Sequence, residues 1–464
     1  MRPVLLSQVA QWTGGRLLGD DRLVDQLVTD TRTLASAATA SAVFVALKGE
    51  RFDGHAHVGD AARAGIRAAL VAHETDAPLS QVVVADTERA LAALGAAMQG
   101  TWSTKVVAIT GSNGKTSVKS LLLSILQRVG VAYANPGNRN NEIGLPLAVL
   151  DAPEDAQFSI YEMGAGKPGD IAYLTAIARP DVALVNNIAP AHLERMGSLL
   201  GVADTKAAIY DALPSGGVAV INADDAFAPY FAERAHGHRL IRFGLEASAD
   251  ITARDIVLDA DGARFTLVTP QGDCDIELAL PGRHNVLNAL AAAALAVGVD
   301  ASLNAIREGL VAARAVAGRL VTHHLPNGVV LIDDSYNANP GSLNAAIDTL
   351  AAASTSSAAG ESWLVLGDMR ELGDDEVALH AEAGRRAKSA GIARLYAFGP
   401  LSAAAVQTFG AGAEHYDSHA ALADALRAAL KPDVRVLVKG SRGSAMDRIV
   451  SALLPNGESH HHAA

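Results

Sequence analysis

The sequence has a single cysteine, no long apolar run and fewer basic than acidic residues. With Cys274 as its only cysteine, the 464-residue chain can form no internal disulfide, which fits a reducing compartment. No segment reaches the roughly 18 consecutive apolar residues of a membrane-spanning helix, and the N-terminal apolar stretch is too short for a signal peptide. We therefore expect a cytoplasmic protein.

Basic residues are in deficit: 38 of them face 50 acidic residues, and the net charge is −12. No long basic run is present either, so the overall electrostatics disfavour a nucleic-acid backbone or an anionic membrane surface. A small anionic substrate remains compatible, because a local basic pocket matters more than the total charge. We expect no nucleic-acid binding and no integral membrane association.

The length and the order of the apolar runs predict several α/β domains. A chain of 464 residues exceeds what one hydrophobic core serves, so about two to four domains are expected. Strand-like runs alternate with helical stretches in three units, placed at residues 1–85, 86–318 and 319–464. The middle unit contains KVVAIT, FSIYEM, DVALVNN and GGVAVINA, a rhythm that predicts a mostly parallel, doubly wound sheet. Residues 250–280 change to short alternating runs typical of antiparallel hairpins.

A glycine-bearing loop between the strand KVVAIT and a helix starting near Lys115 predicts a phosphate site. Free N–H groups and the positive dipole end at a helix N-terminus favour anions. Gly111 and Gly114 let the backbone approach a phosphate, while Lys115 supplies a charge and Thr116 a hydroxyl ligand for magnesium. The helix is expected to carry a set of apolar residues on one face, at helical spacing: Val118, Leu121, Leu122, Ile125, Leu126 and Val129.

The loop departs from the GxxxxGK[ST] pattern, because Ile109 stands where the first glycine is usual. An ordinary strand-to-helix turn with an exposed lysine is therefore the alternative. A switch GTPase would carry an N-K-x-D motif, and none occurs. The segment VVLIDD at 329–334 imitates the magnesium-binding strand of a motor ATPase, but it lies more than two hundred residues after the loop and is expected in another domain.

Further motifs follow one another along the chain: TGSNGKTS, NPGNRNNEIGLP, YEMGA, NNIAPAHLERMGS, PGRHNVLNALAA, GRL, IDDSYNANP, LGDM and KGSR. In order and spacing they resemble the Mur ligase family of peptidoglycan synthesis over residues 27–454. The resemblance implies an α/β, three-domain architecture. Its parts would be a UDP-substrate-binding domain, a central doubly wound P-loop ATPase-like domain that binds ATP, and a C-terminal Rossmann-like ligase domain.

The resemblance also implies an ATP-dependent ligase that forms amide bonds. Such an enzyme transfers the γ-phosphoryl group of ATP to a substrate carboxylate, and an amine attacks the resulting acyl phosphate. The motifs NNEIG, EMGA, DDSYNANP and KGSR point to UDP-N-acetylmuramoyl-tripeptide and D-alanyl-D-alanine as substrates. Negative charge gathers between the reactants, so lysine and Mg²⁺, with two ions expected, must neutralise it. The enzyme is expected to act as a monomer.

By this resemblance the catalytic residues are Lys115, Glu162, His192 and Lys206. Thr116 and Glu162 would hold one magnesium ion near the phosphates. His192 and Lys206 would serve a second ion, with Lys206 carbamylated so that it becomes a carboxylate-like ligand. The alternatives are a solvated strand-end carboxylate, a hydrogen-bonded loop histidine and a solvated lysine on a helix over 199–212.

The ATP-binding residues implied by the resemblance come from the phosphate loop, one helix start and the third unit. They are Gly111, Ser112, Asn113, Gly114, Lys115, Thr116, Ser117, His284, Asn285, Asn288, Arg319, Asp334 and Tyr336. Arg319 would approach a phosphate, Asp334 the ribose and Tyr336 the base. As alternatives, Asn285 could cap its helix and Asp334 could start a turn.

The substrate-binding residues implied by the resemblance are Thr31, Arg32, Lys48, Asn138, Asn140 and Asn141. The basic groups would serve the diphosphate, although a surface role for Arg32 and Lys48 is the alternative. The asparagines either contact the muramoyl peptide or shape their own loop.

Two other functions remain open. One is a Mur ligase that adds a single amino acid. The other is a catalytically silent nucleotide-binding regulator with the same fold, which would not need Lys115, Thr116, Glu162, His192 and Lys206 together.

Overall fold

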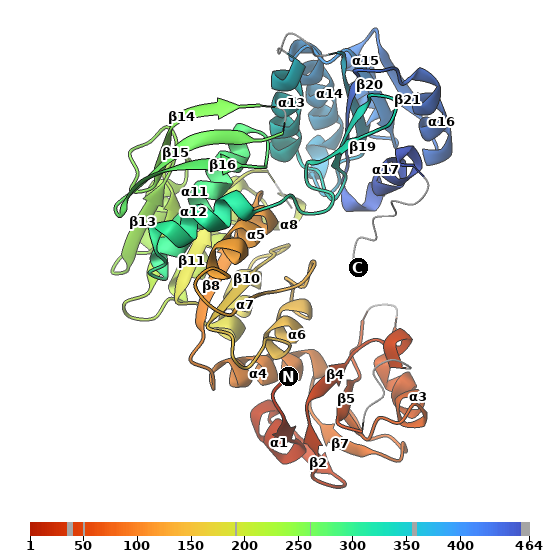
Figure 1. Ribbon diagram of the computed structural model, residues 1–464. Helices are drawn as coiled ribbons and strands as arrows, with labels where there is room; N and C mark the ends of the chain where they lie inside the picture. Colours follow the sequence, from red (N-terminus) through yellow and green to blue (C-terminus); the bar gives the residue numbers. More distant parts are fainter. Residues whose placement is uncertain (35–39, 50–51, 191–192, 260, 355–359, 456–464) are drawn as a thin grey trace.

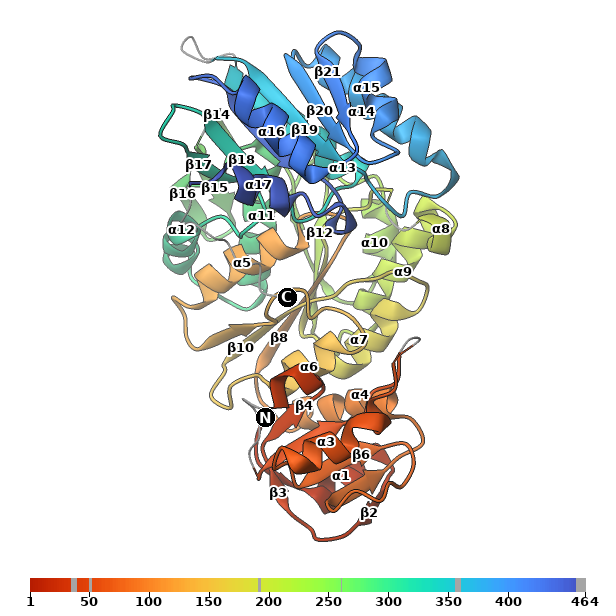
Figure 2. The ribbon, with the colours of Figure 1, turned by 90° about the vertical axis from the view of Figure 1, so that its right-hand side faces the viewer.

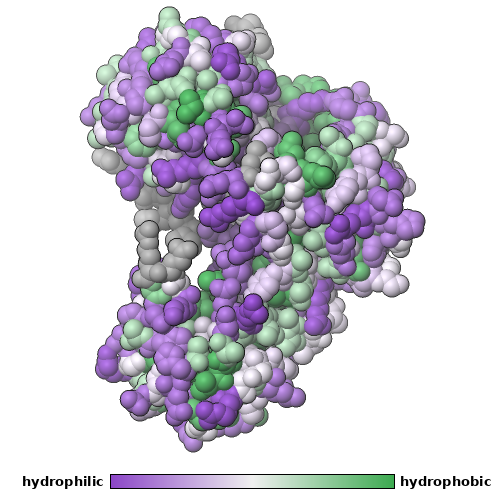
Figure 3. Space-filling model, turned by 180° about the vertical axis from the view of Figure 1, so that it is seen from behind, coloured by the Kyte–Doolittle hydropathy of each residue, from purple (hydrophilic) through white to green (hydrophobic). Residues whose placement is uncertain are grey.

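Three lobes follow one another along the chain in the computed structural model, which describes residues 1–34, 40–49, 52–190, 193–259, 261–354 and 360–455. The N- and C-terminal lobes lie at opposite ends, with the central lobe between them (Figures 1 and 2). Seen from behind, a gap separates the two outer lobes on one side of the molecule (Figure 3). Within the ranges given, no helix is both long and apolar enough to cross a membrane.

The N-terminal lobe is built on a five-stranded sheet whose strands pair in parallel, except that β2 is antiparallel to β7. In spatial order the strands are β2 (Arg16–Leu18), β7 (Ser80–Val83), β6 (Ala68–Val71), β5 (Ala42–Val45) and β4 (Gln26–Val28). The other elements are β1 (Val4–Leu5), α1 (Leu6–Thr13), β3 (Leu23–Val24), η1 (Thr31–Thr33), η2 (Gly54–His57) and α3 (Val58–Arg63).

Helix α4 (Thr87–Gln99) links the N-terminal and central lobes. It packs against α1 on one side and against α6 (Gly144–Leu150) and α7 (Asp170–Ala178) on the other. Its buried residues are divided accordingly: Leu91 and Leu94 belong to the N-terminal core, and Ala92 to the central core. The helix therefore serves two cores at once.

The central lobe contains a six-stranded, wholly parallel sheet. Its strands in spatial order are β13 (Arg239–Phe243), β12 (Val218–Asn222), β11 (Val182–Val185), β8 (Lys105–Thr110), β10 (Phe158–Glu162) and β9 (Ala132–Ala134). Val107 and Ile109 of β8 pack on one face, while Val106 and Ala108 pack on the other. Because both faces are covered by helices, the sheet is doubly wound and its four inner strands, β8, β10, β11 and β12, are buried along nearly their whole length.

Helix α5 (Lys115–Leu126) begins directly after the phosphate loop and covers one face together with α11 (Arg283–Gly298). The predicted apolar face is buried from Val118 to Leu126. The prediction that Val129 lies on this helical face is wrong, since α5 ends at Leu126 and Val129 is 43% exposed. The helix ends before it, because the N–H groups of Arg128 and Val129 bond to the last helical carbonyls in a turn.

The remaining elements of the central lobe are helices on either face and a small antiparallel sheet. The helices are α8 (Leu193–Met196), α9 (Leu199–Asp211), α10 (Ala228–Arg234) and α12 (Leu303–Ala312). The three-stranded sheet is β14 (Thr252–Leu258), β15 (Ala263–Thr269) and β16 (Gly272–Leu278). Its antiparallel pairing confirms the hairpins predicted for residues 250–280.

The C-terminal lobe has a six-stranded sheet that is parallel except for the edge strand β17. In spatial order the strands are β17 (Val321–His324), β18 (Val330–Asp334), β22 (Arg435–Lys439), β19 (Ser362–Gly367), β20 (Arg394–Phe398) and β21 (Ala413–Tyr416). The helices are α13 (Pro340–Ser354), η3 (Gly373–Asp375), α14 (Glu376–Ser389), α15 (Ala403–Phe409), α16 (His419–Ala429), η4 (Arg442–Ser444) and α17 (Asp447–Leu453).

The predicted α/β class, with a doubly wound central sheet and a Rossmann-like C-terminal sheet, is confirmed. The edge strands of the three large sheets were not predicted: β2 and β4, β9 and β13, β17 and β21. They are short or partly exposed, so their apolar pattern is weak. The domain boundaries at 85/86 and 318/319 remain predictions.

Candidate functional site

A cavity of about 690 Å³ lies at the carboxyl ends of β8 and β10, between the central and C-terminal lobes. Ligands of open α/β sheets typically bind at this edge. Most of the predicted site residues line it: Gly111, Ser112, Asn113, Gly114, Lys115, Thr116, Ser117, Asn138, Asn140, Asn141, Glu162, Lys206, His284, Asn285, Asn288, Arg319, Asp334 and Tyr336. The cavity thus gathers residues that are more than two hundred positions apart in sequence.

The phosphate loop is held tightly against the neighbouring strand ends. Gly114 has φ +79°, and a Cβ there would lie 2.4 Å from Asn288 Oδ1 and 2.5 Å from Asn186 Nδ2, so only glycine fits. The side chain of Asn187 accepts a hydrogen bond from Asn113 N at 2.8 Å. Lys115 Nζ lies over the loop and donates to the Gly111 carbonyl at 2.7 Å.

Burial lowers the pKa of Lys115, although the nearby Glu162 carboxylate opposes this effect. The lysine is thus less strongly held in its ammonium form than a solvated lysine. An additional anion beside it would stabilise the charged form.

Glu162, the last residue of β10, is 4% exposed and has donors around both carboxylate oxygens. Thr116 Oγ1 donates to Oε2 at 2.9 Å, and Asn140 Nδ2 donates to Oε1 at 3.0 Å. Lys119 Nζ lies 3.2 Å from Oε2. Burial alone would raise the pKa of Glu162, but Lys119, Lys115 and Arg319 outweigh it and lower the pKa. Glu162 is therefore ionised, and the predicted alternative of a solvated carboxylate is wrong.

Thr116 and Glu162 offer the oxygen donors that a magnesium ion requires. Among the residues whose placement is described, no group of three or more His, Cys, Asp and Glu side chains could hold a metal ion. Magnesium beside a nucleotide, however, usually has only one or two protein carboxylates, with phosphate oxygens and water completing its shell. The hydroxyl and carboxylate oxygens, 2.9 Å apart, fit such a site.

Lys206 lies on α9 with 2% of its surface exposed, so it is not the solvated helix lysine of the alternative prediction. Burial, assisted by the charge of Lys115, lowers the pKa of Lys206 to about 7. A large fraction of this side chain is therefore a neutral amine near pH 7. Its predicted partner His192 lies outside the described residues.

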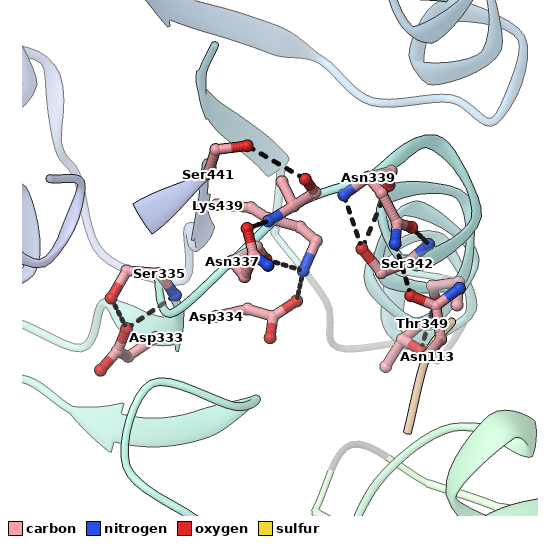
Figure 4. Close-up of polar contacts among 12 residues, drawn as sticks. Asn113, Asp333, Asp334, Ser335, Asn337, Asn339, Ser342, Thr349, Lys439 and Ser441 are labelled. Atoms are coloured by element: carbon pink, nitrogen blue, oxygen red, sulfur yellow. Dashed lines mark hydrogen bonds and ion pairs between the residues drawn. The ribbon is translucent and has the colours of Figure 1, made fainter. Parts of the chain in front are cut away.

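The C-terminal lobe reaches the phosphate loop through two side chains. Arg319 Nη2 donates to Thr116 Oγ1 at 2.9 Å, and its guanidinium carbon lies 4.5 Å from the centre of the Tyr336 ring. Asn339 Nδ2 donates to Asn113 Oδ1 at 2.8 Å, a contact visible in Figure 4. Both lobes therefore meet at the loop.

Asp334, the last residue of β18, points toward Lys439 rather than toward the phosphate loop (Figure 4). Lys439 Nζ lies 2.6 Å from Asp334 Oδ2 and donates to the Asn337 carbonyl at 3.0 Å. The position of Asp334 in the C-terminal sheet agrees with the prediction that VVLIDD is no magnesium strand of the central domain.

The start of α11 contributes three polar side chains to the cavity. Burial, with help from Lys439, lowers the pKa of His284 to about 4, so its imidazole is neutral near pH 7. Asn285 Nδ2 donates to the Pro281 carbonyl at 2.8 Å, and Asn288 Nδ2 donates to Asn285 Oδ1 at 3.2 Å. Asn285 does not cap the helix, because Gly282 occupies the N-cap position without a side-chain hydrogen bond.

The predicted substrate residues of the N-terminal lobe, Thr31, Arg32 and Lys48, do not line this cavity. The Arg32 side chain is 87% exposed and pairs with Asp30 at 2.6 Å. Lys48 is also exposed. The structure thus brings together the predicted nucleotide residues but leaves these three apart from them.

Sequence reasoning missed several polar residues that support the site: Lys119, Asn187, Asn339 and Lys439. Three of them, Asn187, Asn339 and Lys439, lie within the motifs NNIAPAHLERMGS, IDDSYNANP and KGSR, but were themselves given no role. Lys119 follows Lys115 by one helical turn, and this spacing was the available signal.

A parallel sheet with a phosphate loop, faced by a second Rossmann-like lobe, defines a nucleotide-binding α/β protein of several domains. Residues 109–296 match the Mur ligase middle domain, and residues 318–442 match the Mur ligase, glutamate ligase domain. The chain belongs to the Mur ligase family.

Its relatives share nearly the whole chain. The UDP-N-acetylmuramoyl-tripeptide–D-alanyl-D-alanine ligase of Escherichia coli (strain K12) is 42% identical over 460 residues, covering 98% of this chain and 100% of that protein. A crystal structure of MurF from Acinetobacter baumannii has a TM-score of 0.91 at 34% identity, covering 98% of this chain and 99% of that one. MurF ligase from Thermotoga maritima in complex with ADP has a TM-score of 0.83 at 27% identity, covering 92% and 97%.

Proposed function

We propose that this protein is an ATP-dependent ligase that joins D-alanyl-D-alanine to UDP-N-acetylmuramoyl-tripeptide in the synthesis of peptidoglycan precursors. One observation carries the proposal: Thr116 Oγ1 is bonded both to Glu162 of the central sheet and to Arg319 of the C-terminal lobe, at 2.9 Å each. A phosphate loop, a carboxylate and a cation from another lobe thus meet at one point. The names of the full-length relatives give the substrates.

In the proposed reaction the residues around the loop position the γ-phosphoryl group of ATP against the substrate carboxylate. Lys115 and Arg319 neutralise the phosphate oxygens, and the loop N–H groups fix the nucleotide at the start of α5. Thr116 and Glu162 would hold Mg²⁺, which would supply charge stabilisation during phosphoryl transfer. Catalysis of such transfers is mainly positioning and electrostatics.

Lys206 is proposed to act as a carbamylated ligand for a second magnesium ion, together with His192. Its support is the depressed pKa of about 7, because only a neutral amine reacts with carbon dioxide. The carbamate would give the cavity a second carboxylate-like group beside Lys115.

The nucleoside is proposed to lie along His284, Asn285 and Asn288, with Asp334 at the ribose and Tyr336 at the base. The neutral imidazole of His284 supports a contact with an uncharged base. The asparagines 138, 140 and 141 are proposed to face the muramoyl peptide, and Thr31, Arg32 and Lys48 the uridine nucleotide. All proposed groups come from one chain, so the chemistry needs no second copy.

The test is phosphate release by the purified protein with ATP, Mg²⁺ and both substrates. We expect release to require both UDP-N-acetylmuramoyl-tripeptide and D-alanyl-D-alanine, with a product whose mass equals their sum less water. Replacing D-alanyl-D-alanine by free diaminopimelate or lysine should give no product. Formation of a product from free diaminopimelate or lysine would instead favour a Mur ligase that adds a single amino acid.

The Lys115→Ala variant should lose turnover while keeping the fold, as checked by circular dichroism. A folded, unchanged protein that binds ATP but releases no phosphate with the full substrate set would favour the silent regulator. Retention by this chain of Lys115, Thr116, Glu162 and Lys206 speaks against that alternative.

A further inference from the structure

A buried lysine to which the proposed reaction assigns no role lies beneath the phosphate loop. Lys119, one helical turn after Lys115, is 5% exposed, and its ammonium nitrogen lies 3.2 Å from Glu162 Oε2. It also donates to the carbonyl oxygens of Asn135 at 2.8 Å and Gly137 at 3.3 Å. A buried ammonium must find such partners, because losing its hydration is costly. Lys119 therefore joins α5 to two other segments at once.

The segment 135–141, here called the asparagine loop, is tied to the end of β10 by amide side chains. Asn135 Oδ1 accepts from Glu162 N at 2.9 Å, and Asn135 Nδ2 donates to the Glu162 carbonyl at 3.1 Å. Asn135 Nδ2 also donates to the Arg139 carbonyl at 2.8 Å. These bonds fix the loop backbone relative to Glu162.

The two oxygens of the Glu162 carboxylate face different segments. Oε2 meets α5 through Thr116 and Lys119, whereas Oε1 meets the asparagine loop through Asn140. Lys119 contacts both the Glu162 carboxylate and the carbonyl oxygens of the asparagine loop, so it links the two directly. A shift of α5 therefore moves the carboxylate and the loop together.

We propose that Lys119 is a positioning residue that couples occupation of the phosphate loop to the arrangement of the asparagine loop. The inference rests on the proposed function, in which α5 serves ATP and the asparagine loop serves the UDP-linked substrate. A ligand that orders one segment then lowers the free-energy cost of ordering the other segment. Such coupling needs a contiguous network with both sites attached, and it acts equally in both directions.

Isothermal titration calorimetry tests this coupling without turnover. The affinity for UDP-N-acetylmuramoyl-tripeptide is measured with and without a non-hydrolysable ATP analogue and Mg²⁺. In the unchanged protein we expect the analogue to tighten binding at least about fivefold. The ratio of interest is the dissociation constant of UDP-N-acetylmuramoyl-tripeptide without the analogue divided by that with it. In Lys119→Met this ratio should fall to about one. In Lys119→Arg, which keeps a cation, part of the ratio should return.

Lys105→Met is the matched control. Lys105 also pairs with a carboxylate, Asp181 at 3.3 Å, but its side chain is 61% exposed and it stands at the start of β8, away from the loop. This control should keep the full ratio. A merely structural role of Lys119 would lower thermal stability without removing the ratio.

Two outcomes would overturn the inference. One is an undiminished ratio in folded Lys119→Met, and the other is a ratio of about one in the active unchanged protein. If Lys119→Met does not fold, Asn140→Ala removes the bond between the asparagine loop and Glu162 Oε1 and should lower the ratio. An undiminished ratio in that variant counts against the coupling. An unchanged protein that binds neither ligand would instead remove the proposed function, and the inference with it.

Discussion

Two buried lysine–carboxylate pairs stand at the carboxyl ends of strands in different sheets. Glu162 pairs with Lys119 at 3.2 Å in the central lobe, and Asp334 pairs with Lys439 at 2.6 Å in the C-terminal lobe. Each acid ends an apolar strand, so the two segments look alike in sequence. Their surroundings differ, because Lys119 comes from the helix after the phosphate loop, whereas Lys439 comes from the adjacent strand β22 at the same register.

This difference decides what each acid can do. Glu162 has Thr116 on one oxygen and lies beside Lys115, so a ligand at the phosphate loop meets it directly. Asp334 is held by Lys439 of its own sheet, and Arg319, whose charge opposes the rise that burial causes in the pKa of Asp334, is the residue that bonds to Thr116. Of these two strand-end acids, Glu162, which stands beside the phosphate loop, is therefore the candidate metal ligand.

The largest expected effect separates the two acids by activity. Glu162→Gln should lower phosphate release roughly 10³-fold and raise the magnesium concentration needed, because a proposed ligand is lost. Asp334→Asn should raise the KM for ATP by about tenfold and leave the magnesium dependence unchanged. Initial rates over a grid of ATP and Mg²⁺ measure both. If both variants required the same increase in magnesium concentration, Glu162 and Asp334 would not differ as candidate metal ligands.

The next effect concerns stability. Lys439→Met leaves the Asp334 carboxylate buried without its partner, so we expect a loss of about 3–5 kcal/mol in the free energy of unfolding. Adding Asp334→Asn should restore part of it, since the unpaired charge is then absent. Urea unfolding of the single and double variants gives the comparison. An equally unstable double variant would show that lost packing, not charge, is responsible.

A third buried lysine, Lys206, forms no ion pair among the described residues, and the stability of the protein should depend on pH through it. The folded-state pKa of Lys206 is lowered to about 7 from 10.5, so the unfolded state binds more protons between these values. The free energy of unfolding should therefore gain up to ~1.4 kcal/mol per pH unit from this group as pH rises above 7. Lys206→Met should remove that gain. Identical pH profiles of the two proteins would contradict it.

The smallest effect is expected for an exposed pair, Arg32 with Asp30 in the N-terminal lobe. Arg32→Ala should leave the urea midpoint unchanged, because solvent screens such pairs. It should weaken binding of the UDP-linked substrate about tenfold if the arginine holds a phosphate. Calorimetry in the absence of ATP measures this affinity. Unchanged affinity would leave Arg32 as a surface residue.

The strand, loop and helix around Lys115 could be predicted from sequence because their signals are local. Gly111 and Gly114, the apolar strand before them and the helical spacing after them all lie within one short segment. Glu162 was found through its motif at a strand end. These positions line the cavity as a group.

The partners of these residues could not be predicted in the same way. Lys439 meets Asp334 only because β18 and β22 are neighbours in register, and Asn339 meets Asn113 only because two lobes touch. Val129 was misplaced because the apolar spacing was followed past Leu126, where a turn ends α5. Tertiary pairing of this kind leaves no local pattern.

Helix α4 has a mechanical consequence. Because its apolar side chains are embedded in two cores at once, the N-terminal and central lobes are expected to move as a single body. The C-terminal lobe meets the phosphate loop through the polar contacts of Arg319 and Asn339, which water can replace at little cost. The three lobes then behave as two rigid bodies joined by one hinge, which is located where the chain passes from α12 into β17.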